Sequence, residues 1–135
     1  MTSRRSKRAF KIAEKHGPSD ETRNIACKDT EYAFLYARDI DKKPRDDTRK
    51  AACEDPWWAC CYAREIDKEP RDDTRKAACE NSKYAYEYAK NIDECPRDDT
   101  RKAVCGDPQN ACNYALEIDK CSREDTREAA CRDIY

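Results

Sequence analysis

The chain has 135 residues, room for one ordinary domain, and 42% of them are charged. Such a charge content with few large aliphatic residues is typical of disordered chains, yet the net charge is only -1 and apolar residues recur at fixed places. No apolar run reaches the roughly 18 residues of a membrane-spanning helix, and the basic start precedes no apolar stretch. We therefore expect a cytoplasmic protein with no membrane contact and no secretory signal.

Residues 18–135 repeat themselves with a period of 26 residues. Each complete copy carries a Thr-Arg pair, a cysteine, a Tyr-Ala pair and an Ile-Asp pair at constant spacing. The copies span 18–43, 44–69, 70–95, 96–121 and the incomplete 122–135. Self-similarity at a fixed period is the signature of a solenoid, in which neighbouring units stack into a continuous core.

Each copy predicts two short helices, which we name A and B. The A helix, residues 46–53 in the second copy, begins with two aspartates that suit the positive end of the helix dipole. The B helix begins at Asp55 and Pro56, an N-cap acceptor followed by a proline at the first helical position. Its buried face is predicted by the helical spacing of Ala59, Tyr62, Ala63 and Ile66.

The two ends depart from this pattern. Residues 1–17 are predicted to be a basic leader with a degenerate B helix at 5–16 that caps the stack, because Ala9 and Ala13 align with Ala85 and Ala89. The last copy would supply an A helix without a hairpin partner. We therefore predict an all-α solenoid of about five two-helix repeats, with one leading B helix, five A helices, four complete B helices and no strand.

One phrase of the repeat resembles short helical repeats of uncharacterised phage and environmental proteins. It is Tyr-Ala-x-x-Ile-Asp-Lys-x-Pro-Arg-Asp-Asp-Thr-Arg-Lys-Ala-Ala-Cys, at residues 62–79, and the resemblance covers nearly the whole chain. It implies a helical repeat fold and a viral source, with the host cytoplasm as the place of action. No catalytic residue and no assigned activity come with it.

Ten cysteines raise the question of disulfides or a metal. Neighbouring helices pack about 8–10 Å apart, whereas a disulfide needs Cα atoms within about 7 Å. The chain has one histidine and no CxxC pair, so we predict no metal, no cofactor and mainly free thiols that act as small apolar fillers. Cys60 and Cys61 should point to different sides of their helix, and Cys95 and Cys121, in equivalent turns, should be the most reactive.

The repeated acidic residues do not indicate an enzyme, because an active site needs one unique constellation. No phosphate-binding loop, nucleophile–base pair or zinc motif is present. One aspartate per copy falls at the carboxyl end of a B helix, where negative charge is unfavourable: Asp41, Asp67, Asp93 and Asp119. A column of arginines is predicted to compensate these charges in a structural ion-pair ladder: Arg23, Arg49, Arg75, Arg101 and Arg127.

The positions that vary between copies suggest a site. Positions equivalent to 57, 61 and 64 lie opposite the buried B-helix face at about 100° per residue and are expected to be solvated. The second copy has Trp57, Cys61 and Arg64 there, and the first has Leu35 at the place of Cys61. An exposed tryptophan beside a leucine is typical of a partner-binding surface. The alternative is a solenoid that curls and covers this face, whereas Trp58 is predicted to pack between units.

The favoured function is a non-catalytic protein-interaction scaffold, and in a viral setting an effector that binds and inhibits a host protein. One alternative is a nucleic-acid-associated protein that uses the basic leader, with Arg4, Arg5, Lys7, Arg8, Lys11 and Lys15. The acidic residues elsewhere make this alternative the less favoured one. Another alternative is a structural subunit that assembles with itself through open solenoid ends.

Overall fold

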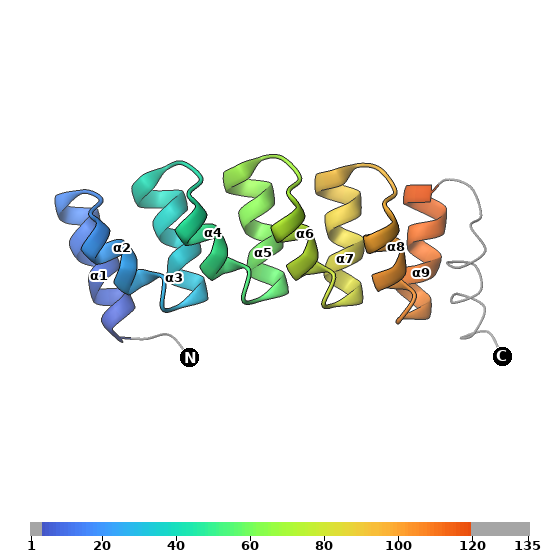
Figure 1. Ribbon diagram of the computed structural model, residues 1–135, viewed down its shortest axis with the longest axis horizontal. Coiled ribbons are helices and arrows are strands. Elements are labelled where there is room, and N and C mark those ends of the chain that lie inside the picture. The colour runs from blue at the N-terminus through green and yellow to red at the C-terminus, as the bar shows by residue number, and fades with distance from the viewer. Residues whose placement is uncertain (1–3, 120–135) are drawn as a thin grey trace.

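The computed structural model describes residues 4–119, and these residues are helical apart from short connections. The helices stand side by side in one row, with α1 at one extremity and α9 near the other (Figure 1). The predicted all-α repeat fold is therefore confirmed for this part of the chain. The predicted fifth A helix, with Arg127, lies outside the described residues, as does the incomplete copy 122–135.

The predicted A and B helices alternate along the row. The A helices are α2 (Asp20–Ala26), α4 (Asp46–Ala52), α6 (Asp72–Ala78) and α8 (Asp98–Val104). The B helices are α1 (Arg4–His16), α3 (Thr30–Leu35), α5 (Pro56–Tyr62), α7 (Ser82–Tyr88) and α9 (Pro108–Tyr114). Each B helix from α1 to α7 packs most extensively against the A helix that follows it, and successive B helices from α3 onward also touch one another.

Side chains at the predicted caps start the B helices. The carboxylate of Asp55 accepts hydrogen bonds from the backbone N–H groups of Trp57 and Trp58, at 2.9 and 3.4 Å. Pro56 occupies the first helical position, where no N–H donor is needed. The equivalent caps of the later and earlier copies are Asp29, Asn81 and Asp107. The sequence signal for the start of each B helix is therefore confirmed.

The B helices end in a way that their periodicity did not predict. The last turn of four of them is a π-helix: η1 (Tyr36–Asp41), η2 (Ala63–Asp67), η3 (Ala89–Asp93) and η4 (Ala115–Asp119). In η2 the Lys68 amide donates to the Ala63 carbonyl, five residues back, at 2.8 Å. Lys68 itself is left-handed, with a φ of 56°, and its equivalents Lys42 and Glu94 have the same conformation.

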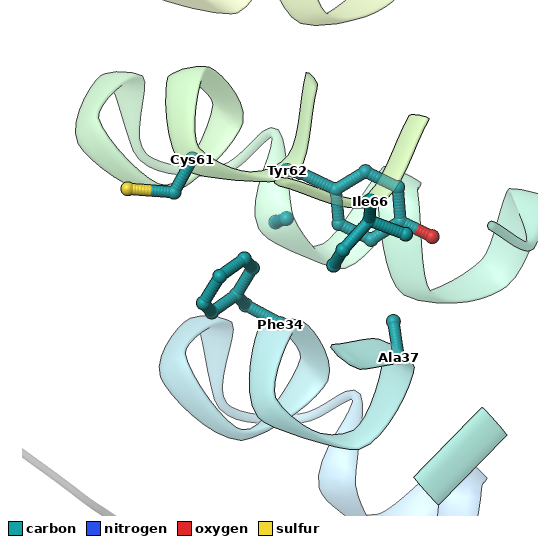
Figure 2. Packing of buried hydrophobic residues seen from close by; sticks show 6 residues of the cluster. Phe34, Ala37, Cys61, Tyr62 and Ile66 are labelled. Carbon is teal, nitrogen blue, oxygen red and sulfur yellow. The ribbon is translucent and has the colours of Figure 1, made fainter. Parts of the chain in front are cut away.

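The core is made of small residues and tyrosines repeated in every unit. Ala52, Ala59 and Ala63 have no exposed surface, so the helices approach one another closely. Figure 2 shows Tyr62 and Ile66 of one B helix lying over Phe34 and Ala37 of its neighbour. Because each cluster joins neighbouring units, burial accumulates along the row.

The first helix takes the place of a B helix, as predicted. Ala9 and Ala13 are buried, like the alanines with which they align. The Ser6 hydroxyl donates to the Ile25 carbonyl at 3.1 Å, and the aligned Ser82 hydroxyl donates to the Ala103 carbonyl at 3.0 Å. The same contact at equivalent positions supports the alignment, and α1 therefore starts the row.

Candidate functional site

The predicted arginine ladder is present in the four copies that the structure describes. In the second copy, the Arg49 guanidinium donates from Nε and Nη2 to the Asp67 carboxylate, with Nη2 at 2.6 Å, and from Nη1 to Asp46 at 2.8 Å. The Arg49 and Asp67 side chains are 5% and 1% exposed, so this is a buried, two-pronged ion pair. The equivalent pairs are Arg23–Asp41, Arg75–Asp93 and Arg101–Asp119.

A tyrosine and a threonine complete each rung of the ladder. The Tyr62 hydroxyl lies 2.7 Å from the Thr48 hydroxyl, accepts from the Arg45 amide and donates to the Arg45 carbonyl. The Arg49 guanidinium lies over the Tyr62 ring, 5.5 Å from its centroid. This network ties the B helix to the start of the A helix of the same copy and satisfies polar groups there.

The electrostatics of the ladder indicate a structural role. The hydrogen bonds from Arg49 to Asp67 are the largest cause that raises the pKa of Arg49, and Arg23, Arg75 and Arg101 are raised in the same way. A guanidinium with a raised pKa cannot act as a proton donor near neutral pH. The aspartates at the ends of the B helices are enclosed, whereas the aspartates at the starts of the A helices are exposed. The buried pairs therefore hold each B helix against its A helix.

The cysteines within residues 4–119 are buried or half-buried, with the exception of Cys95. Burial raises the pKa of Cys60 to about 12 and that of Cys27, Cys53 and Cys79 to about 11. The eight described cysteines are free thiols, and among them only Cys95 is exposed. Cys121, the other predicted reactive thiol, lies outside the described residues.

The candidate binding surface centres on Trp57. Trp57 is 40% exposed, as its position opposite the buried helix face predicted, and the described chain covers it only in part. Its ring lies 6.4 Å from that of Trp58 and 5.7 Å from that of Tyr84. Trp58 and Tyr84 are half-buried, so three adjoining rings from two neighbouring B helices form one surface, which we name the aromatic patch.

Of the other predicted members of this surface, Cys61 is buried and Leu35 is half-buried. The prediction that Cys61 is solvated is wrong: it is 3% exposed and packs against Phe34 of the preceding B helix (Figure 2). Leu35 is half-buried and packs against the same cluster. Helical periodicity placed position 61 outward, but a neighbouring helix covers this flank of each B helix in the row. The solvent-exposed strip of a B helix is therefore narrower than the exposed face that an isolated amphipathic helix would have.

Tyr84 is the member that sequence reasoning missed. It is the equivalent of Trp58, which packs between units as predicted, 5.3 Å from the Phe34 ring. Because neighbouring B helices pack side by side, the Tyr84 ring of one helix lies next to the Trp57 ring of the preceding one. The patch therefore spans the second and third copies, whereas the prediction placed it on the first and second.

One cation lies on the aromatic patch itself. Lys83 lies over the Tyr84 ring, 5.7 Å from the centroid. Arg64 is exposed as predicted, but its guanidinium lies 3.7 Å from the Glu65 carboxylate. Arg38 lies over the Phe34 ring at 5.3 Å and is paired with Asp39. The patch is thus an apolar surface with a positive charge at the Tyr84 edge.

The described residues contain no group of three or more histidine, cysteine or acidic side chains placed to hold a metal ion. Among them, too, no helix has both the length and the apolar character needed to cross a membrane. Comparison of the chain with protein-family models, with curated proteins and with solved structures finds no match.

Proposed function

We propose that the protein is a non-catalytic scaffold that binds a protein partner through the aromatic patch. The observation that carries this proposal is the 40% exposure of Trp57 at a position where the other copies have Glu31, Lys83 and Gln109. A large exposed ring that the stack does not require is costly in water, and tryptophan is enriched where binding energy concentrates.

The patch is held in shape before any partner arrives. Asp55 fixes the backbone N–H of Trp57, and Trp58 below it packs on Phe34. A rigid surface loses little conformational entropy on binding. Lys83 at the Tyr84 edge favours a partner whose apolar contact residue is bordered by a carboxylate.

We place this interaction in the cytoplasm, where the chain's many thiols stay reduced. The resemblance to phage repeat proteins extends the proposal to a viral effector that binds and inhibits a host protein. The ladder supports the non-catalytic part of the proposal, since it occupies the repeated arginines and their aspartate partners in buried pairs.

The test compares Trp57→Ala with Gln109→Ala, its matched control, because Gln109 is the exposed equivalent of Trp57 two copies away. Proteins captured from a host lysate by the wild type are purified and titrated against each variant by calorimetry. Trp57→Ala should weaken binding by about 30-fold, the effect of losing about 2 kcal/mol at a binding hot spot. Gln109→Ala should bind like the wild type.

Melting curves test whether a loss of binding by Trp57→Ala comes from unfolding of the variant. Trp57→Ala should melt within a few degrees of the wild type, because Trp57 is 40% exposed and belongs to none of the buried clusters. Trp58→Ala should melt clearly lower, since the loss of a half-buried ring costs about 2 kcal/mol, below the about 3–5 kcal/mol of a fully buried one. Equal affinity of Trp57→Ala and the wild type for every captured protein would contradict the proposal, as would unfolding of Trp57→Ala.

A further inference from the structure

The outer face of α1 corresponds to a stacking face in the other B helices. In α5 and η2, the side chains of Trp58, Cys61, Tyr62 and Ile66 pack toward the preceding unit. With the alignment supported by Ser6 and Ser82, the equivalent residues of α1 are Arg8, Lys11, Ile12 and His16. Among the described residues nothing packs on this face, and Ile12 is 44% exposed.

Cations replace two of these four residues, at Arg8 and Lys11, and further cations line the same face. Its cations follow helical spacing and, with Ile12 and His16, border one shallow hollow: Arg4, Lys7, Arg8, Lys11 and Lys15. We name these residues the basic end face. None of the five cations forms an ion pair with a described residue, whereas exposed arginines elsewhere, such as Arg38, Arg45 and Arg64, lie beside a carboxylate.

Charge is therefore separated along the row. Helix α1 has six cationic side chains and one acidic one, a net charge of +5, so the rest of the chain carries -6 because the whole carries -1. Helix α1, which carries the positive charge, lies at one extremity of the row (Figure 1), and the remaining chain is acidic. Such a molecule approaches a polyanion with the α1 end first.

The composition of the face selects the kind of polyanion. Its one exposed apolar side chain, Ile12, is too little to enter a bilayer, for which amphipathic helices present a broad apolar side. The face has no asparagine or glutamine to read adenine, and its five cations bind phosphate oxygens whatever the base. Cations about 5–6 Å apart on a helix face suit the closely spaced phosphates of a duplex, one about every 3.4 Å of axis on each strand.

We infer that the basic end face binds the phosphate backbone of double-stranded nucleic acid, end-on and without sequence preference. The acidic body is repelled by the same phosphates, so the row projects away from the duplex and leaves the aromatic patch accessible. This inference is independent of the proposed protein partner, because the two surfaces lie on different helices and share no residue.

The test is a titration of a fluorescent DNA duplex of about 20 base pairs at several salt concentrations. The variant Lys7→Gln/Lys11→Gln/Lys15→Gln removes three cations from the basic end face. Its matched control, Lys50→Gln/Lys76→Gln/Lys102→Gln, removes the same charge from exposed positions of three A helices. Circular dichroism confirms that both variants are folded.

The wild type should bind at about 50 mM salt, and log affinity should fall against log salt with a slope of about -3 to -4.5 for contacts to three to five phosphates. The end-face variant should bind at least tenfold more weakly, with a slope shallower by about 2–3, while the control keeps the wild-type slope. A duplex of different sequence should bind equally well.

Three results would overturn the inference. The first is the absence of binding by the wild type at low salt, and the second is an equal loss of affinity in both variants. The third is binding to vesicles of phosphatidylserine and phosphatidylcholine but not to DNA, which would assign the face to a lipid surface.

Discussion

At the scale of single residues, buried charge is the feature that most needs an explanation. Asp67 ends a B helix, where its negative charge is unfavourable, and its side chain is 1% exposed. Arg49 makes this position tolerable, because it donates two hydrogen bonds to Asp67 and a third to Asp46. Neither member of such a pair can be removed without leaving the other charge buried and unpaired.

Arg75→Ala tests this role in the middle of the row. It should lower the free energy of unfolding by about 3–5 kcal/mol, because Asp93 would be left as an uncompensated buried charge. Arg64→Ala is the control, since its exposed pair with Glu65 is worth about 0–1 kcal/mol. Urea unfolding followed by circular dichroism measures both. A loss below 1 kcal/mol for Arg75→Ala would show that the ladder is dispensable.

The buried thiols predict a loss of stability at alkaline pH. Desolvation raises the pKa of Cys60 to about 12, whereas thiols of the unfolded chain ionise near about 8.5. The folded state therefore keeps a proton that the unfolded state releases. The stability that this difference contributes is complete below about pH 8.5 and is lost as the pH rises toward 12.

Urea unfolding at pH 7.5 and pH 10 measures this effect, and Cys60→Ala should lose less stability between the two than the wild type. Alkylation at neutral pH gives a second readout, in which exposed Cys95 should react first among the described cysteines. Equal pH dependence in the wild type and Cys60→Ala would refute the assignment.

At the scale of elements, the sequence predicts those features of the B helices that depend on local signals or on repetition. The starts of these helices were predictable because Asp55 and Pro56 act on their own backbone. The burial of Tyr62 and the pairing of Arg49 were predictable because every copy keeps the same residue types. Local signals and internal repetition were therefore sufficient to predict the helical repeat fold.

The candidate site was predicted less well. Trp57 stood out because it breaks a pattern that the other copies obey. Burial of Cys61 and the approach of Tyr84 depend on which flank of a B helix faces its neighbour, and a single-helix projection contains no such information. The π turns were missed as well, because an extra residue in the last turn leaves the spacing of Tyr62, Ala63 and Ile66 unchanged.

The end of each B helix offers a stabilising substitution. Lys68 is left-handed, with a φ of 56°, a conformation that costs an L-residue with a side chain about 1–2 kcal/mol. Lys68→Gly removes this strain but gives the unfolded chain more freedom, so the expected net gain is about 0.5–1 kcal/mol. Lys68→Ala, which keeps a Cβ, should change little. Chemical unfolding measures both, and destabilisation by Lys68→Gly would contradict the prediction.

At the scale of the whole molecule, each copy contacts only its neighbours, so stability is a sum over copies and their interfaces. The rungs of the ladder are internal to a copy: Arg75 pairs with Asp93, and Thr74 with Tyr88, all within 70–95. A complete copy therefore contains both members of its buried ion pair and of its Tyr-Thr hydrogen bond, and contacts such as Ser82 with Ala103 join it to the next copy.

Deletion of residues 70–95 should leave a folded but shorter row. The new junction joins Glu69 to Pro96 and restores the sequence Glu-Pro-Arg-Asp-Asp-Thr-Arg that the deletion removes. Deletion of 70–82 is the control, because it removes Arg75 and Thr74 and leaves Asp93 and Tyr88 without partners. Mean residue ellipticity should stay the same for the first deletion and collapse for the second. Unfolding of both would show that the copies are not modular.

The self-contained rung also bears on how the gene can change. Unequal crossing-over between repeated stretches of coding sequence adds or removes whole multiples of 26 codons, and every such product keeps each buried arginine with its aspartate. Recombination that adds or removes any other number of codons separates an arginine from its aspartate. It leaves a buried charge without a partner and yields a chain that cannot fold. The number of repeats is thus free to change, whereas the 26-residue phase is not. The copy with Trp57 and Trp58 can be moved, multiplied or lost as a single heritable unit.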